Sequence, residues 1–185
     1  MSVIAGKIRF LSRFLTCPRE VGSITPSSGF LVNAICKTVF WNRVELVVEL
    51  GAGTGVVTAE IARNLKPGAK AVIFEKDAVF SRQLKRDFPL FTHCRDAMRL
   101  TEELETHGIR EADCIISCLP MANFSTEQRV ELLDHVKKVL KPDGMFVQYQ
   151  YSLQMKKTLK SRFKVVHTHF VPLNLPPAFV HVCQD

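Results

Sequence analysis

The feature that most constrains the fold is an apolar run that ends in an acid and three alternating glycines, Val47-Val48-Glu49-Leu50-Gly51-Ala52-Gly53-Thr54-Gly55. Residues 44–50 are apolar and β-branched, which predicts a short buried strand. Between Thr54 and Leu65 the apolar spacing becomes helical. Glycines at a strand-to-helix turn permit positive φ and let a ligand approach the main chain. The sequence therefore predicts a ligand site at the N-terminus of the helix that begins at Thr54.

Further strands and helices alternate along the chain. A helix is expected from Thr25-Pro26, with Leu31, Ile35 and Val39 on one face. Such alternation predicts an α/β fold with a mostly parallel sheet and helices on both faces. The patterns predict strands at 71–75, 91–94, 113–117, 145–151, 164–169 and 178–183, helices at 77–87, 126–140 and about 153–159, and a turn at 141–144.

Length and composition indicate one domain of 185 residues, 46% of them hydrophobic. We divide it into an N-terminal helical extension, residues 1–41, and a core, residues 42–185. No apolar run reaches the ~18 residues that span a bilayer, and no signal peptide is recognised. We therefore expect a cytoplasmic protein, peripheral on the inner face of the membrane. Six cysteines without a C-x-x-C pair indicate buried thiols, and no metal site is expected.

The net charge of +7 is concentrated at the two ends. Residues 1–41 carry +4, residues 42–136 carry −3, and residues 137–185 carry +6. Residues 144–184 contain no Asp or Glu. Basic ends around an acidic middle favour an anionic partner, either phospholipid or nucleic acid, although solvated surface is the simpler alternative.

The opening segment, residues 2–16, has the spacing of an amphipathic helix. A basic, acid-free polar face beside aromatics is typical of a helix in a membrane interface, whereas a helix packed on the domain is the alternative. The predicted contacts are Lys7, Arg9, Phe10, Arg13 and Phe14.

Acidic residues follow the predicted strands at the edge where a ligand binds in such folds. Glu75 lies twenty residues after Gly55, where a carboxylate can accept hydrogen bonds from both ribose hydroxyls of a nucleoside. Asp96 follows the third strand. A dinucleotide site requires G-x-G-x-x-G, but here the third glycine comes one residue early and position 56 is Val. The spacing favours a different adenosine ligand.

The segment Glu49-x-Gly51-x-Gly53-x-Gly55 resembles motif I of the class I S-adenosylmethionine-dependent methyltransferases, and the strand pattern resembles their seven-stranded Rossmann-like fold. The cofactor is a cation without a pyrophosphate, so neighbouring acids suit it. On this resemblance, Glu49 and residues 51–55 contact its methionine part, Glu75 holds its ribose, and Asp96, followed by Ala97 and Met98, meets its adenine. The implied cofactor-binding residues are Glu49, Gly51, Ala52, Gly53, Thr54, Gly55, Glu75, Lys76, Asp96, Ala97 and Met98.

The segment after the fourth strand bears on the methyl acceptor. Adenine-N6 methyltransferases carry an Asn-Leu-Pro-Tyr-like motif there, whose polar and aromatic residues hold the flipped base. This chain has Ser117-Cys118-Leu119-Pro120-Met121, which keeps Leu-Pro but replaces the polar Asn and the aromatic residue. An RNA adenine is therefore the alternative acceptor rather than the expected one.

Other segments resemble the bacterial phospholipid N-methyltransferases, which methylate phosphatidylethanolamine towards phosphatidylcholine. The most specific are Val21-Gly22-Ser23-Ile24-Thr25-Pro26-Ser27-Ser28 and Asn174-Leu175-Pro176-Pro177-Ala178. The resemblance runs from about residue 10 to the C-terminus and implies a phospholipid substrate on an anionic membrane surface. A non-catalytic membrane- or RNA-binding module that kept the fold is a further alternative.

No general base is evident in the sequence. The candidate catalytic residues are Ser117 and two tyrosines, Tyr149 and Tyr151, whose rings share one side of a strand and attract methylated ammonium, unless they are core aromatics. His167 and His169 lack a third ligand, so we expect surface histidines rather than a metal pair. Candidate lipid contacts are Ser23, Ser27 and Ser28, which could equally cap the next helix, and Lys156 and Lys157.

Overall fold

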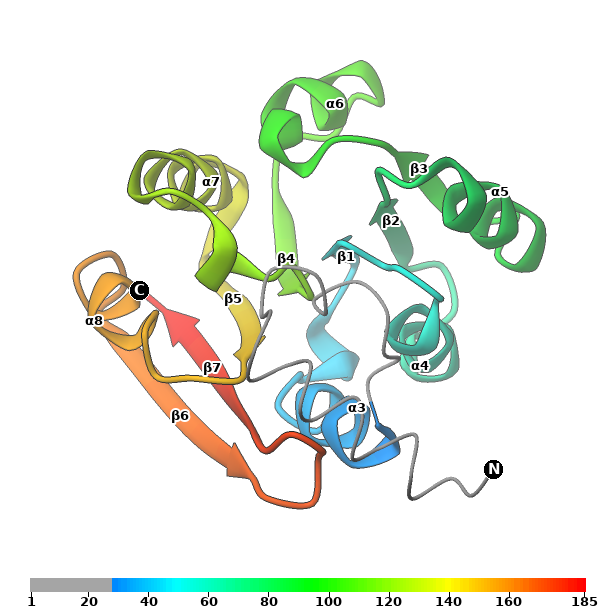
Figure 1. Ribbon diagram of the computed structural model, residues 1–185. Helices are drawn as coiled ribbons and strands as arrows, with labels where there is room; N and C mark the ends of the chain where they lie inside the picture. The colour runs from blue at the N-terminus through cyan, green and yellow to red at the C-terminus, as the bar shows by residue number, and fades with distance from the viewer. Residues whose placement is uncertain (1–27) are drawn as a thin grey trace.

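The computed structural model describes residues 28–185, which form one twisted sheet covered by helices (Figure 1). Its strands lie in the order β3-β2-β1-β4-β5-β7-β6. The first five in that order are parallel, and β7 is antiparallel to both β5 and β6. The predicted mostly parallel, seven-stranded α/β fold is therefore confirmed. The bounds are β1 Leu46–Leu50, β2 Lys70–Phe74, β3 Thr92–Cys94, β4 Ala112–Ser117, β5 Leu140–Gln150, β6 Val165–Val171 and β7 Ala178–Gln184.

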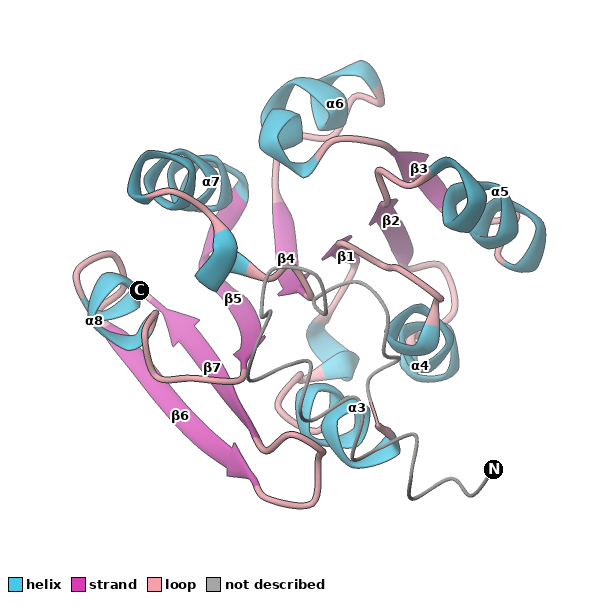
Figure 2. Cartoon of the chain, in the orientation of Figure 1, coloured by secondary structure: helices cyan, strands magenta, loops and turns pink. Residues whose placement is uncertain are grey.

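Helices pack on both faces of the sheet (Figure 2). Val47 and Val48 are consecutive in β1 and point to opposite faces, so the core forms two apolar layers. Helices α3, α4 and α5 contribute to the layer of Val47, and α6, α7 and α8 to the layer of Val48. Their bounds are α3 Gly29–Cys36, α4 Val56–Asn64, α5 Ala78–Asp87, α6 Leu100–Thr106, α7 Thr126–Val139 and α8 Lys156–Lys160, with short 3-10 helices η1 Trp41–Arg43, η2 Ala97–Arg99 and η3 Met121–Asn123.

Side-chain caps explain where several helices begin. Asp77 accepts hydrogen bonds from the main-chain N–H groups of Val79 and Phe80 at the start of α5. Ser125 and Gln128 form a reciprocal capping box at the start of α7. The helix expected from Thr25-Pro26 instead begins at Gly29, because Ser28 is extended and its Oγ accepts a hydrogen bond from the N–H of Leu31.

The sequence predicts a turn at residues 141–144 before a strand that begins at residue 145. This prediction is wrong. Strand β5 already begins at Leu140, which pairs with Ala112, and the regular pairing resumes at Met145. The residues between them bulge out of the ladder. A Cβ on Gly144 would lie 2.8 Å from Cγ of Leu140, so the bulge requires glycine.

The order of the strands locates the functional edge of the sheet. Strand β1 lies between β2 and β4, so the chain leaves the centre of the sheet in opposite directions after β1 and after β3. A crevice forms at the carboxyl ends of the strands at such a reversal. The predicted helix over residues 2–16, with Lys7, Arg9, Phe10, Arg13 and Phe14, and the residues Ser23 and Ser27 lie outside the described residues. Within residues 28–185, no helix is both long and apolar enough to cross a membrane.

Candidate functional site

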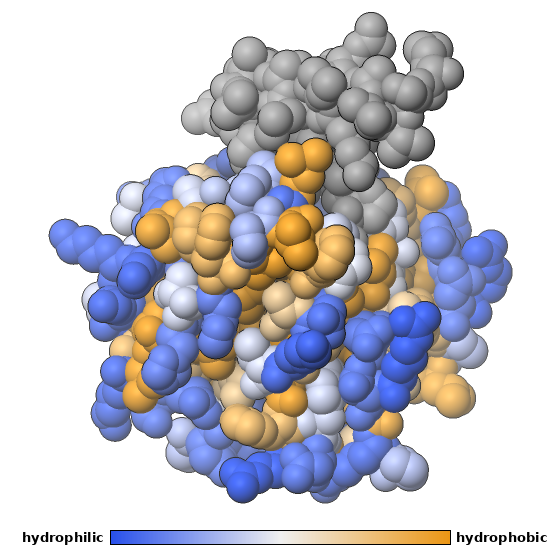
Figure 3. Space-filling view, turned by 90° about the horizontal axis from the view of Figure 1, so that it is seen from below, coloured by the Kyte–Doolittle hydropathy of each residue, from blue (hydrophilic) through white to orange (hydrophobic). Residues whose placement is uncertain are grey.

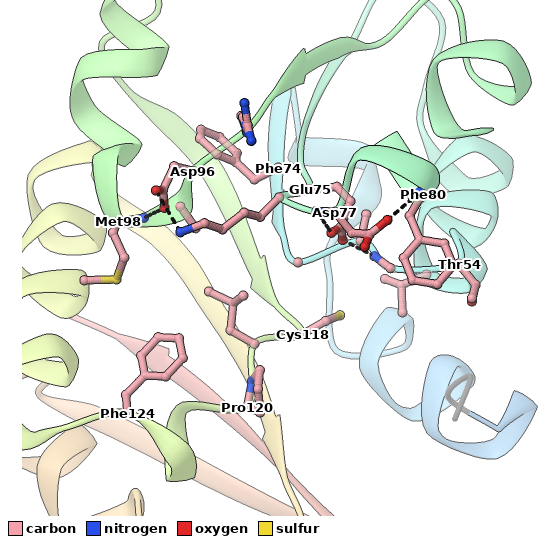
Figure 4. Close-up of a pocket in the computed structure, with 18 of the residues that line it drawn as sticks. Thr54, Phe74, Glu75, Asp77, Phe80, Asp96, Met98, Cys118, Pro120 and Phe124 are labelled. Carbon is pink, nitrogen blue, oxygen red and sulfur yellow. Dashed lines mark hydrogen bonds and ion pairs between the residues drawn. The ribbon is translucent and has the colours of Figure 1, made fainter. Parts of the chain in front are cut away.

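A cavity of about 730 Å³ opens at the carboxyl ends of β1, β2 and β4. Its volume falls within the range of ~300–1,000 Å³ that is usual for small-molecule sites. Figure 4 shows side chains from the loops after β1, β2, β3 and β4 around this space. The predicted cofactor residues that line it are Gly51, Ala52, Gly53, Thr54, Glu75, Lys76, Asp96, Ala97 and Met98.

The glycine turn lets the main chain form one wall of the cavity. Gly51 has a φ of +78°, and a Cβ added to it would lie 2.7 Å from Cδ2 of Leu119. Gly53 has a φ of +55°, and its added Cβ would meet nothing within 4 Å, so its main chain faces open space. Gly55 has a φ of +82° and faces Leu84 at 2.9 Å rather than the cavity. Gly51 therefore allows close packing against the loop after β4, Gly53 leaves room for a ligand, and Gly55 lets the chain enter α4.

Glu75 links the glycine turn to the end of β2. Its Oε2 accepts a 2.6 Å hydrogen bond from the N–H of Gly53, and its Oε1 accepts one of 2.7 Å from the N–H of Asp77. A carboxylate has about four acceptor positions, so two remain for a ligand. This geometry fits a carboxylate that accepts from two ribose hydroxyls.

Asp96 is fixed at the end of the cavity beyond β3. Its Oδ1 accepts a 3.1 Å hydrogen bond from the N–H of Met98, and its Oδ2 lies 3.2 Å from Nζ of Lys76. Glu103 accepts hydrogen bonds from the N–H groups of Arg95 and Asp96, which holds the loop in place. The Lys76 side chain is 75% exposed, so its ion pair contributes little stability.

Glu49 lies beneath the glycine turn rather than in the cavity. Its side chain is fully buried, and its Oε2 accepts a 2.7 Å hydrogen bond from Oγ1 of Thr58 in α4. Its Oε1 has no partner among the described residues. Burial, with a smaller effect from the charge of Glu75, raises the pKa of Glu49 to about 7. Glu49 therefore does not line the cavity, and its predicted contact with the cofactor stays a prediction.

The donor set fits a cationic nucleoside ligand. Carboxylates of Glu75 and Asp77 lie next to the glycine turn, and the lysine that lines the cavity, Lys76, is paired with Asp96. A pyrophosphate would be repelled by these acids, whereas a sulfonium would be attracted. Open space at Gly53 allows a ligand to lie against the main chain. The cavity therefore suits S-adenosylmethionine.

The wall formed by the loop after β4 and the end of β5 is largely apolar. Tyr149 lines it, whereas Tyr151 packs edge-on against Tyr149 with ring centroids 5.8 Å apart. The predicted common side of the two rings is confirmed. Of this pair only Tyr149 reaches the cavity, so Tyr151 acts as its support. The other residues of this wall are Cys118, Leu119, Pro120 and Phe124.

Ser117 does not reach the cavity. It is fully buried and lies in register with Gln148 of β5, which is in register with His181 of β7. Each of the three keeps one polar atom without a partner among the described residues. Burial lowers the pKa of His181 to about 4, so its imidazole is neutral at pH 7. Ser117 is therefore part of a buried polar row, not a group that touches a ligand.

The remaining predicted residues lie away from the cavity. Ser28 caps α3, which was the predicted alternative to a lipid contact. Its Oγ also donates a hydrogen bond to Oδ1 of Asn174. Lys156 and Lys157 lie in the first turn of α8. Residues 28–185 contain no group of three or more side chains arranged to hold a metal ion.

Several lining residues were missed by the sequence patterns. Phe80 lies in the first turn of α5 and Gln128 in the first turn of α7, both at the carboxyl edge. A helix that follows a parallel strand starts at that edge, so its first turn is the signal that could have identified them. Arg95 precedes Asp96 and lines the same end of the cavity.

Comparisons with known proteins agree with this geometry. Residues 47–144 match the family model described as "Methyltransferase domain". The ornithine lipid N-methyltransferase of Singulisphaera acidiphila is 33% identical over 180 residues, covering 95% of this chain and 94% of that protein. Two similar structures are the O-methyltransferase TomG from Streptomyces achromogenes with bound SAM (TM-score 0.66, 12% identity, covering 97% of this chain and 89% of TomG) and an O-methyltransferase from Bacillus cereus with SAH (TM-score 0.67, 10% identity, covering 95% and 91%).

Proposed function

Because the chain belongs to the class I S-adenosylmethionine-dependent methyltransferases, we propose that it transfers a methyl group to the amino group of a membrane lipid. The observation that carries this proposal is the 33% identity to an ornithine lipid N-methyltransferase along 95% of the chain. That similarity extends beyond residues 47–144, which match the general methyltransferase model. It therefore includes the end of β5 with Tyr149, which lines the cavity beyond the region that the general model matches.

The geometry supports a lipid amine better than an RNA base. The loop after β4 presents Leu119, Pro120 and Phe124 to the cavity, while the side chain of Ser117 is buried behind them. A flipped adenine needs a polar side chain for its amino group at this loop. Tyr149 instead offers an aromatic face, which attracts alkylated ammonium groups.

The chain contributes mainly position to the reaction. When bound, the cofactor supplies an electrophilic methyl group on a sulfonium sulfur. Glu75 and Asp96 would orient its nucleoside, and the open space at Gly53 would let the part near the sulfur lie against the main chain. The amine must lose a proton and align its lone pair with the methyl carbon, and alignment alone accounts for much of the rate in such transfers. Tyr149 borders the space where the acceptor nitrogen would lie.

Phosphatidylethanolamine is the substrate that the sequence resemblance implies, with methylation towards phosphatidylcholine. The similar protein from Singulisphaera is named for ornithine lipid. Both lipids offer a primary amine close to an anionic group, so one cavity chemistry suits either. We propose phosphatidylethanolamine as the first substrate to test and a location on the inner membrane surface, where this lipid is reached without leaving the bilayer.

The test supplies methyl-labelled cofactor and three acceptors in separate reactions. They are phosphatidylethanolamine vesicles, ornithine lipid vesicles and RNA, the lipid arms sharing the same phosphatidylglycerol content. Label in either lipid supports the proposal, and the preferred arm identifies the headgroup. Label in RNA alone would overturn it in favour of a base methyltransferase. Label in none of the arms, with cofactor binding intact, would favour a binding module without turnover.

A further inference from the structure

Large apolar side chains are exposed on one face of the molecule, around the start of α3 and the end of β6. Leu173 is 68% exposed, Phe40 61%, Phe170 57%, Phe30 56% and Leu175 43%. We call these five residues the apolar face. Figure 3, seen from the end of the molecule that carries α3 and the β6–β7 connection, shows hydrophobic side chains gathered between hydrophilic ones. Exposed apolar clusters of this kind mark interaction sites.

A groove of about 670 Å³ runs along the apolar face between α3 and the edge strand β6. Phe30, Phe40, Phe170 and Leu173 line it together with Lys37, and none of its lining residues is acidic. Arg43 lies over the ring of Phe40, with 5.9 Å between the guanidinium carbon and the ring centroid. Cationic groups therefore stand directly beside the aromatic ones.

The connection between β6 and β7 is built to present apolar side chains outward. Leu173 and Leu175 are exposed, whereas Asn174 between them is 4% exposed. Nδ2 of Asn174 donates a 2.7 Å hydrogen bond to the carbonyl of Pro176, and its Oδ1 accepts one from Oγ of Ser28. The leucines are thus held at the surface by an anchor that ties the connection to the cap of α3.

The charge at the groove itself has one sign. Residues 28–44 and 144–184, which include α3, α8, β6 and β7, contain no Asp or Glu. They contain seven basic residues, of which Lys37 and Arg43 lie beside the groove, whereas the other five lie in or just after α8, on the other face of the sheet. An apolar groove with two cations beside it and no acidic lining residue complements a bilayer that carries anionic lipid. The basic residues are Lys37, Arg43, Lys156, Lys157, Lys160, Arg162 and Lys164.

One end of the apolar face, with Leu173 and Leu175, lies at the functional edge of the sheet, whereas Phe40 lies towards the other edge, near Met145 and Gln184. Gln150, at the carboxyl end of β5, pairs with Phe179, and Val171 pairs with Ala178. The connection that carries Leu173 and Leu175 therefore projects from the same edge as the cavity, one strand beyond Tyr149. A bilayer in contact with these leucines would lie against the edge that takes up the lipid amine.

We propose that the apolar face docks the protein on an anionic lipid bilayer, with Leu173, Leu175 and Phe170 entering the interface and Lys37 and Arg43, which stand beside the groove, meeting the headgroups. This deepens the proposed function, on which it rests for the identity of the substrate. A second copy of the chain is the competing occupant, but the cations beside a groove without acidic lining residues would repel an identical surface.

The experiment compares the full-length wild type with the double variant Leu173→Glu/Leu175→Glu and with Leu173→Ser alone. Leu90→Glu is the matched control, because Leu90 is 96% exposed and lies beside β3 at the opposite edge of the sheet. Binding is measured by co-sedimentation with phosphatidylethanolamine/phosphatidylglycerol vesicles, and folding by thermal unfolding. We expect the double variant to lose about tenfold or more in vesicle affinity, the serine variant less, and Leu90→Glu none.

Activity separates this inference from the proposed function. We expect the ratio of activity on vesicles to activity on a monomeric short-chain lipid to fall about tenfold in the double variant. The wild type could bind vesicles without methylating any lipid. If the double variant then loses this binding, the result would support the docking surface and refute the proposed function. Equal vesicle affinity in the wild type and the folded double variant would overturn the docking surface, as would a change from dimer to monomer without a change in vesicle affinity.

Discussion

The main-chain N–H of Gly53 donates a 2.6 Å hydrogen bond to Oε2 of Glu75, joining the turn after β1 to the end of β2. The same carboxylate accepts from the N–H of Asp77, which caps α5. One side chain thus fixes the glycine turn and a helix N-terminus relative to one another. Changes at these residues should therefore affect cofactor affinity before they affect the fold.

Replacing Glu75 by Ala removes the acceptor for both ribose hydroxyls. Hydrogen bonds to a charged group contribute ~1.5–3 kcal/mol each, so affinity for S-adenosylmethionine should fall by about 10- to 100-fold or more. Isothermal titration calorimetry measures this directly, and Glu105→Ala, which removes only an exposed ion pair with Lys138 and does not line the cavity, is the control. An unchanged dissociation constant for Glu75→Ala would refute the assigned role.

Gly51→Ala tests the close approach of the turn to the loop after β4. The new Cβ would lie 2.7 Å from Cδ2 of Leu119, which lines the cavity. Gly68→Ala is the matched control, because Gly68 has a similar φ of +86° but no atom within 4 Å of its added Cβ. Both variants should lose ~1–2 kcal/mol of stability to the left-handed conformation, but Gly51→Ala alone should lose cofactor affinity. Equal losses of affinity would contradict this account.

Glu49 should make the unliganded protein less stable as the pH rises. Burial raises its pKa from 4.5 to about 7 in the folded state, so the folded protein binds the proton more tightly than the unfolded chain. The protonated Glu49 carboxyl makes its full contribution to the free energy of unfolding below pH 4.5, and this contribution is lost as the pH rises to about 7. The free energy of unfolding of Glu49→Gln, relative to that of the wild type, should therefore rise by up to ~3 kcal/mol between pH 4.5 and about 7. Urea unfolding without cofactor measures this difference. A constant difference between the two proteins at every pH would refute the raised pKa.

Tyr149 should matter through its ring rather than its hydroxyl. Tyr149→Phe keeps an aromatic face towards the acceptor, whereas Tyr149→Ala removes it and leaves Tyr151 without its edge-on neighbour. Loss of a cation–π contact of ~1–2 kcal/mol predicts that Tyr149→Ala reduces the rate with the methylated lipid about 5- to 30-fold. Steady-state kinetics with mono- and dimethylated lipid measure this. A larger loss in Tyr149→Phe than in Tyr149→Ala would instead assign the function to the hydroxyl.

Much of the fold could be predicted because buried parallel strands and their helices leave strong patterns. Strand β1, helix α4 and the placement of Glu75 and Asp96 at one edge all followed from apolar spacing and the glycine turn. The helix α6 was missed, since it is only seven residues long and its buried side chains, Leu100, Thr101 and Leu104, do not form a clear stripe. Pro142 and Gly144 are typical of turns and of bulges alike, so the sequence alone predicts a turn where the structure has a bulge.

The depth of a side chain could not be predicted from its place in the sequence. Glu49 and Ser117 both end strands at the functional edge, yet each is fully buried behind the cavity. Glu49 belongs to a familiar motif, but its contact with Thr58 depends on how α4 packs on the sheet. The apolar face could not be predicted for the same reason. Phe30, Phe40 and Leu173 meet only when α3 and the β6–β7 connection are folded together.

The central claim is that this cavity transfers a methyl group to the nitrogen of a membrane lipid. The most direct measurement incubates the protein with cofactor carrying a carbon-13 methyl group and phosphatidylethanolamine or ornithine lipid vesicles, then locates the label in the extracted lipid by NMR. We predict an N-methyl signal in the lipid that is much weaker with Glu75→Ala when the cofactor concentration only just saturates the wild type. Label on RNA and none on lipid, or label on lipid oxygen rather than nitrogen, would contradict the account.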